Sequence, residues 1–336
     1  MIEKKYFDSF SLKGIRENNE DSIYPTTYSE ICNIFVICDG VGGHDHGEIA
    51  SSLVSRSIGD FLSQFNLLTP EVLQQAIDKS VTVLNNNVLT EDKRKMGTTA
   101  VLCAIRENDI LVGHAGDSRL YQIRPSSGII FKTKDHSKVQ EWVDAEVISE
   151  EEARTHPKKN IITRCITPNP DKPVILEINK LTDIKNDDYL FMCTDGVNDA
   201  LEDSELFAIF SSSLSNEEKM ENIKKLCINK SRDNFSAILI ALRVHNTYTK
   251  TNFTIDYFKE VVASESQCKP CQLQRPCVFI NKKIDDWCIK RINNKDSEKK
   301  KCNFKITHSV ILIIIAIIVS LAFIILLKVL LTHYNK

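Results

Sequence analysis

The order of apolar patterns in the first 245 residues is the feature that most limits which folds this chain can adopt. Short runs rich in β-branched residues, separated by turn-forming residues, are typical of strands. Such runs occupy 31–38, 99–106, 109–115, 120–124, 174–178, 189–193 and 235–244. Apolar residues at helical spacing mark 47–65 and 70–89, and a shorter helical pair follows at 204–210 and 217–228. Helices therefore come in pairs between groups of strands, which favours packed β-sheets covered by helices over strict β-α-β alternation.

The end of the chain carries a different pattern. Residues 309–327 include two serines and no charged side chain, and a helix of about 20 apolar residues spans the hydrocarbon core of a bilayer. A buried core helix is the alternative, but such a helix would show a polar stripe, and the run has none. Lysines gather before the run, while only Lys328 and Lys336 follow it. Because basic residues near a span stay cytoplasmic, we expect a single-pass, tail-anchored membrane protein whose preceding domain lies in the cytoplasm.

These patterns divide the chain into four parts. Residues 1–245 are expected to form the globular domain, 246–305 a cysteine- and lysine-rich linker or small module, 306–331 the transmembrane helix, and 332–336 a short tail. No apolar run follows the N-terminus, so we expect no secretory signal peptide. The formal net charge is -2, which gives no global field that would attract nucleic acid.

Several carboxylates stand at the ends of the predicted strands or in the adjoining turns. They are Glu20, Asp21, Asp39, Asp117, Asp195 and Asp233. Asp39 and Asp195 are each followed by glycine, which lets the backbone approach a ligand closely. A single Asp-Gly pair is more often a plain turn. Brought together, however, carboxylates held at strand ends make a hard, oxygen-lined site that suits Mg²⁺ or Mn²⁺.

The motifs around these carboxylates resemble those of the metal-dependent protein phosphatases, also called type 2C or PPM phosphatases, in their bacterial form. The matching segments are Arg-x-x-Asn-Glu-Asp at 16–21, Asp-Gly-Val-Gly-Gly-His at 39–44, Gly-Glu-Ile-Ala-Ser at 47–51, Met-Gly-Thr-Thr at 96–99, Gly-Asp-Ser-Arg at 116–119, Asp-His-Ser at 135–137, His-Pro at 156–157 with Asn-Ile-Ile-Thr-Arg at 160–164, Thr-Asp-Gly at 194–196 and Asp-Asn-Phe-Ser at 233–236. They cover almost the whole of 1–245 in family order. The resemblance implies an α+β fold, a four-layer α-β-β-α sandwich of two antiparallel β-sheets flanked by helix pairs, with a flap at about 138–165.

The resemblance also implies two bound Mn²⁺ or Mg²⁺ ions and a third in a weaker position. Asp39 would bridge the pair, with help from the carbonyl of Gly40, and Asp195 and Asp233 would complete one ion. Glu20 would reach the second ion, and Asp21 would orient the water bound to it. Asp117 would hold the third ion.

The activity implied by the resemblance is that of a protein serine/threonine phosphatase. A metal-bound hydroxide would attack phosphorus in line, without a phospho-enzyme. Arg16 would hold the phosphate, because a planar guanidinium binds two phosphate oxygens at once. His44 would either protonate the leaving oxygen or face solvent in a polar loop, and both interpretations stay open. The expected partners are phosphorylated proteins that a serine/threonine kinase has modified, and no nucleic acid.

Two alternatives differ in partner or in activity. A non-catalytic scaffold would keep the fold and recruit partners, but a pseudo-enzyme usually loses some of the acidic positions, and all of them are present here. A phosphatase specialised for an anti-sigma-type regulator would share the same chemistry.

The eleven cysteines fall into two groups. Six are scattered through the globular part in apolar contexts and are interpreted as small buried residues. In the linker, Cys268 and Cys271 form a Cys-x2-Cys start, followed by Cys277 and Cys288. This resembles half a zinc site, and a second Cys-x2-Cys is absent. Zn²⁺ or another thiolate-bound metal, free or redox-reactive thiols, and palmitoylation of Cys302 are the interpretations that remain.

Overall fold

The computed structural model describes residues 1–27, 29, 32–41, 46–88, 96–169, 171 and 173–245, together with the backbone of 269–270 and 302–303. The chain separates into two units, Met1–Thr247 and Tyr248–Lys336. In the second unit, β12 (Lys269–Pro270) pairs in parallel with β13 (Cys302–Asn303). No helix among the described residues is long and apolar enough to cross a membrane, and the predicted span at 306–331 lies outside them.

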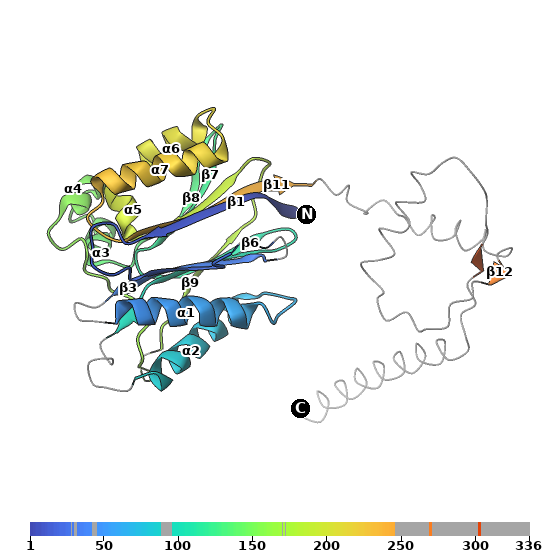
Figure 1. The fold of residues 1–336 in the computed structure, drawn as a ribbon, viewed down its shortest axis with the longest axis horizontal. Helices are drawn as coiled ribbons and strands as arrows, with labels where there is room; N and C mark the ends of the chain where they lie inside the picture. The colour runs from blue at the N-terminus through green and yellow to red at the C-terminus, as the bar shows by residue number, and fades with distance from the viewer. Residues whose placement is uncertain are drawn as a thin grey trace, which may run out of the picture. The chain divides into compact units, whose positions relative to one another are not determined.

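Two antiparallel sheets pack face to face in the first unit, with helices on both outer faces (Figure 1). The five-stranded sheet has the order β1 (Ile2–Leu12), β11 (Phe235–Val244), β10 (Tyr189–Cys193), β7 (Arg119–Arg124) and β8 (Gly128–Lys132). The six-stranded sheet has the order β2 (Asp21–Tyr24), β3 (Ile34–Val41), β5 (Ala100–Ile105), β6 (Ile110–Ala115) and β9 (Glu177–Leu181), and β4 (Gly97–Thr98) pairs with β3. The prediction of two antiparallel sheets covered by helices is therefore confirmed.

The helices fall into three groups. One pair covers the six-stranded sheet: α1 (Gly47–Leu62) and α2 (Pro70–Asn86). A second group covers the five-stranded sheet: α5 (Asp195–Ala200), α6 (Asp203–Ser211) and α7 (Asn216–Lys230). Two short helices lie in the segment where a flap was predicted: α3 (Lys138–Asp144) and α4 (Glu150–Thr155). Local sequence explains where they start: Thr69 caps α2 through its side chain, ahead of Pro70, and Ser215 begins α7 with a capping box.

Three apolar layers hold the sandwich together, one between the sheets and one beneath each helical cover. Strand β3 shows how one run serves two of them. Val36 and Cys38 face the helices α1 and α2, whereas Phe35 and Ile37 face the other sheet. Alternate residues of a strand point to opposite faces, so a strand buried on both faces is apolar throughout. This is why 34–38 forms a continuous apolar run.

One predicted strand begins later in the structure than expected, and the structure contains strands that were not predicted. The prediction of a strand at 174–178 was wrong at its first half, because β9 begins at Glu177. The backbone of the preceding residues bonds to a helix side chain instead: Gln74 Nε2 donates to the Val174 carbonyl at 2.8 Å, and the Leu176 N–H donates to Gln74 Oε1 at 3.0 Å. The strands β1 and β2 were not predicted, and together they frame the acidic segment at 16–21.

Candidate active site

Four of the predicted acidic residues meet at one end of the sandwich. Asp21 and Asp39 lie directly opposite each other on β2 and β3. Asp195 is the first residue of α5, immediately after β10, and Asp117 lies in the turn between β6 and β7. The charges of Asp195, Asp21 and Asp117 all act on the carboxyl of Asp39. The two sheets therefore bring carboxylates from four separate segments into one cluster, in which Asp21 and Asp117 are buried and Asp39 and Asp195 are half-buried.

Burial and mutual repulsion make these carboxylates hard to ionise together. Burial raises the pKa of Asp39 well above its usual value, and the neighbouring carboxylates raise it further. Burial also raises the pKa of Asp21 to about 7 and that of Asp195 to about 6, with Asp233 adding to both. Burial and the charge of Asp195 raise the pKa of Asp117 well above its usual value. Like charges held in a desolvated site are stabilised only by protons or by cations.

Two carboxylate oxygens of the cluster indicate that the site suits cations rather than protons. Oδ1 of Asp21 and Oδ1 of Asp117 are buried and have no hydrogen-bond partner in the part of the chain that the structure describes. A buried acceptor without a donor is costly. Hard divalent cations bind carboxylate oxygens, so the residues present fit Mn²⁺ or Mg²⁺.

The backbone of Asp39 is held by Thr98, the last residue of β4, and by Thr99, which lies between β4 and β5. The Asp39 N–H donates to Thr99 Oγ1 at 3.0 Å, and Thr98 Oγ1 donates to the Asp39 carbonyl at 2.8 Å. Thr99 Oγ1 also lies 2.8 Å from Ser118 Oγ, next to Asp117. The threonines therefore support the carboxylates through hydrogen bonds.

Two glycines allow Glu20 to approach the same end of β3. A Cβ at Gly40 would lie 2.5 Å from the carbonyl of Gly47, at the start of α1. A Cβ at Gly47 would in turn lie 2.5 Å from Oε2 of Glu20. The Gly40 N–H donates to the Glu20 carbonyl at 3.0 Å. Glycine at both positions is what lets the helix, the strand and the Glu20 carboxylate meet.

Arg16 and Asp233 lie at the rim of the cluster. Nη2 of Arg16 is 2.5 Å from Oδ2 of Asp233, and the Arg16 side chain is 57% exposed. The charge of Asp233 acts on Asp21 and Asp195, so it belongs to the same electrostatic group. The structure thus brings Arg16 together with the predicted metal ligands. His44 and the cysteines Cys268, Cys271, Cys277 and Cys288 lie outside the described residues.

Sequence reasoning gave no role to three polar residues that support the site. Thr194 and Ser236 donate hydroxyl hydrogen bonds to Oδ2 of Asp21, at 2.9 and 2.8 Å. The amide of Asn234 bonds the backbone of the segment that carries Glu20. The available signal was their position, since each directly adjoins a predicted ligand or lies in the Asp-Asn-Phe-Ser motif.

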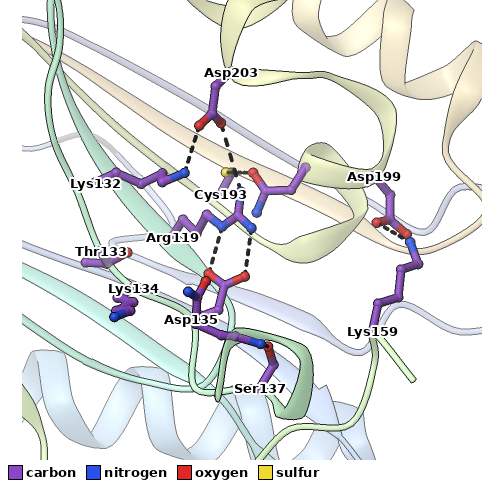
Figure 2. Close-up of polar contacts among 12 residues, drawn as sticks. Arg119, Lys132, Thr133, Lys134, Asp135, Ser137, Lys159, Cys193, Asp199 and Asp203 are labelled. Atoms are coloured by element: carbon purple, nitrogen blue, oxygen red, sulfur yellow. Dashed lines mark hydrogen bonds and ion pairs between the residues drawn. The ribbon is translucent and has the colours of Figure 1, made fainter. Parts of the chain in front are cut away.

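A partly buried ion-pair network fixes the motif that carries Asp117. Figure 2 shows Arg119 between two carboxylates: it donates two 2.7 Å hydrogen bonds to Asp135 and lies 4.0 Å from Asp203. A bidentate guanidinium–carboxylate pair is geometrically specific. Asp203 also accepts a hydrogen bond from Lys132 at 2.8 Å. The start of β7, two residues from Asp117, is therefore tied to both the segment after β8 and the start of α6.

A second group of metal-binding residue types lies next to Gly116. His114, His136 and Glu177 place ligand atoms within 4.8 Å of one another. The two imidazole rings are stacked, with centroids 4.5 Å apart and planes inclined by 16°. A metal ion binds an imidazole nitrogen in the plane of the ring, so two stacked rings are not arranged to share one ion. The Gly116 N–H donates to His136 Nδ1 at 3.1 Å, and His136 Nε2 lies 3.3 Å from Glu177. We interpret this group as structural.

The fold and the acidic site together define a metal-dependent phosphatase of the two-sheet type. Residues 15–227 match the family model described as Protein phosphatase 2C, and the chain belongs to this family. The protein phosphatase PhpP of Streptococcus pneumoniae is 29% identical over 236 residues, which cover 68% of this chain and 93% of that protein. The prediction of a type 2C protein serine/threonine phosphatase is therefore confirmed.

Solved structures support the same assignment. The serine/threonine phosphatase Stp1 from Staphylococcus aureus superimposes with a TM-score of 0.64 at 29% identity, covering 70% of this chain and 94% of that chain. The catalytic domain of the serine threonine protein phosphatase PstP, in complex with two manganese ions, gives a TM-score of 0.60 at 26% identity and covers 71% of this chain and 98% of that chain. Dependence on a divalent metal is a property of the family.

Proposed function

We propose that the acidic cluster holds two Mn²⁺ or Mg²⁺ ions and that the protein hydrolyses phosphoserine and phosphothreonine in other proteins without a phospho-enzyme. The observation that carries this proposal is the cluster of Asp21, Asp39, Asp117 and Asp195, in which two buried carboxylate oxygens have no hydrogen-bond partner among the described residues. When bound, two such ions lower the pKa of a water and offset charge on the attacked phosphoryl group.

The residues of this chain would divide the work as follows. Asp39 would bind both ions with help from the carbonyl of Gly40, and Asp195 and Asp233 would complete one of them. Glu20 would bind the other ion and Asp21 would orient its water, while Asp117 would hold a third, weaker ion. Threonine hydrogen bonds keep the Asp39 backbone in place. Arg16 would bind the substrate phosphate, since it is exposed at the rim and a guanidinium has five N–H donors, of which the pair with Asp233 uses only part.

Phosphate release from a phosphothreonine peptide tests the proposal on the full chain in detergent micelles. The expected result is turnover that needs Mn²⁺, stops in EDTA and is lost in Asp39→Asn. Asp60→Asn is the matched control, because Asp60 is an exposed carboxylate on α1. Turnover that survives in Asp39→Asn or in EDTA would refute the metal site. No turnover by folded, Mn²⁺-loaded protein would favour the scaffold interpretation.

We also propose that the predicted helix at 306–331 tethers the domain to a membrane, with the domain in the cytoplasm. The support is the uncharged run at 309–327 and the lysines that precede it. Carbonate extraction of cell membranes tests the anchor. The full chain should stay with the membrane and a chain ending at residue 305 should not; release of both would rule the tether out.

The general-acid role of His44 and the metal at the cysteines remain predictions. If His44 protonates the leaving oxygen, His44→Ala should slow hydrolysis of a phosphothreonine peptide far more than that of para-nitrophenyl phosphate, whose leaving group needs no proton. If Cys268, Cys271, Cys277 and Cys288 bind Zn²⁺, the purified full chain should carry about one zinc atom more than a Cys268→Ser, Cys271→Ser variant.

A further inference from the structure

The side chain of Asn234 ties the N-terminal acidic segment to the strand that follows Asp233. Asn234 is 5% exposed. Its Nδ2 donates to the carbonyls of Lys13 and Asn18, both at 2.8 Å, and its Oδ1 accepts from the N–H of Glu20 at 2.9 Å. Both amide hydrogens and the amide oxygen are therefore used. A buried polar group satisfied in this way fixes one arrangement of the groups around it.

The segment held by this amide carries two of the proposed functional residues. In the sequence, Arg16 lies between Lys13 and Asn18, whose carbonyls accept from Asn234, and Glu20 supplies the N–H that Asn234 accepts. Gly14 adopts φ +59, and a Cβ there would lie 2.5 Å from the Asp233 carbonyl oxygen, so the loop backbone packs directly against the segment that precedes β11.

The bonds of the Arg16 side chain itself are weaker. Its ion pair with Asp233 is largely exposed, and Nε is 3.4 Å from the Arg232 carbonyl. Exposed ion pairs contribute little on their own because they are solvated and lose side-chain entropy. An arginine that must bind phosphate cannot depend on its own side chain for placement. The backbone beneath it has to be fixed by something that does not change when the substrate arrives.

We propose that Asn234 is the positioning residue for phosphate binding: its amide fixes the 13–20 loop so that Arg16 and Glu20 face the carboxylates of both sheets. This rests on the proposed function, in which Arg16 holds the substrate phosphate and Glu20 reaches a metal ion. Asn234 acts through those residues and does not itself touch the substrate.

Steady-state kinetics of the full chain with a phosphothreonine peptide and Mn²⁺ test the proposal. Asn234→Ala is expected to raise KM for the peptide and the Mn²⁺ concentration for half-activation, and to lower kcat/KM by about 10- to 100-fold, as small misplacements of binding groups do. The matched control is Asn186→Ala, because Asn186 Oδ1 accepts from the Val244 N–H at 2.6 Å and so clamps a loop at the opposite end of β11. It should change none of these three quantities. Circular dichroism at the assay temperature confirms that each variant is folded.

A double-mutant comparison separates positioning from general stability. Arg16→Ala should raise KM for the peptide, and adding Asn234→Ala to it should raise KM by less than about twofold further, because the residue that Asn234 positions is already gone. Fully additive effects on KM, or an Asn234→Ala effect confined to the melting temperature, would overturn the proposal. If Asn234→Ala does not fold, Asn234→Ser keeps a polar group in the space and carries the same comparison.

The two levels of proposal fail differently. If the wild-type chain shows no Mn²⁺-dependent turnover, the proposed function fails, and this inference fails with it. If the wild type is active and Asn234→Ala behaves like Asn186→Ala, only the positioning role is refuted.

Discussion

Replacing Asp21 with asparagine is expected to stabilise the metal-free protein above pH 7. Asp21 is 8% exposed, and its Oδ1 has no hydrogen-bond partner within the described ranges. Burial, together with the charges of Asp195 and Asp233, raises its pKa from 3.8 to about 7. Ionising this carboxyl therefore costs about 4 kcal/mol more in the folded protein than in the unfolded chain.

The sign of the pH dependence follows from the raised pKa. Well below pH 3.8 the carboxyl is protonated in both states and its contribution to stability is fully present. As the pH rises to about 7, the unfolded chain ionises freely and the folded protein does not, so the wild type loses stability. Asparagine cannot ionise, and its oxygen can still accept from Thr194 and Ser236. We expect Asp21→Asn to gain about 2–4 kcal/mol at pH 8 and close to none at pH 4.

Urea unfolding in EDTA, followed by circular dichroism at both pH values, measures the difference. Asp60→Asn makes the same chemical change on the exposed face of α1 and should alter stability by less than about 0.5 kcal/mol at either pH. A gain that is the same at pH 4 and pH 8, or no gain at pH 8, would show that the ionised Asp21 is not destabilising. Asp21→Asn should lower phosphatase activity even while it stabilises the fold.

Other predictions test the metal, the partly buried ion pair of Arg119 and the core. Mn²⁺ at a hundred times the Kd that it has at pH 8 should stabilise the fold by about 2.7 kcal/mol at that pH, and the same Mn²⁺ concentration should shift the calorimetric Tm less at pH 5, because protons then compete for the carboxylates; an equal shift at both pH values would contradict carboxylate ligation. Arg119→Met leaves the partly buried Asp135 carboxylate without its ion-pair partner and should cost about 1–3 kcal/mol in urea unfolding; a loss below about 0.5 kcal/mol would mean that the network is dispensable. Leu73→Ala, at a fully buried position of α2, should cost about 2–5 kcal/mol, whereas Leu67→Ala, 70% exposed, should cost under about 0.5; neither should change kcat per folded molecule.

The fold was predictable where one face of an element is uniformly apolar. The segments 47–65 and 70–89 became α1 and α2 with ends shifted by up to three residues, because helix ends depend on caps as well as on the apolar stripe. Strand β1 was not predicted. It is an edge strand, half-exposed along most of its length, and a bulge between Lys4 and Tyr6 breaks its alternation.

The acidic cluster was predictable in its members but not in its supports. Asp39, Asp195 and Asp233 stand at strand ends, and strand ends can be read from a single sequence. The bonds of Asn234 cannot, because they join residues 214 to 221 positions apart. An asparagine side chain offers donors and acceptors equally, so its residue type does not indicate which backbone groups it will bind.

The arrangement of strands explains why the carboxylates cannot relax away from one another. Asp39 lies in β3, Asp195 follows β10 and Asp233 precedes β11. Each of these strands is central in its sheet and hydrogen-bonded on both sides, β3 between β2 and β5, β10 between β11 and β7, and β11 between β1 and β10. The backbone therefore cannot carry these residues apart without breaking ladder hydrogen bonds of a central strand, which is costly. The repulsion therefore persists in the folded protein, and protonation or a bound cation is the only way to relieve it. Because the strands already fix the oxygens, a bound ion gains the attraction of several carboxylates without having to order them, which is the condition for binding a divalent metal tightly at neutral pH.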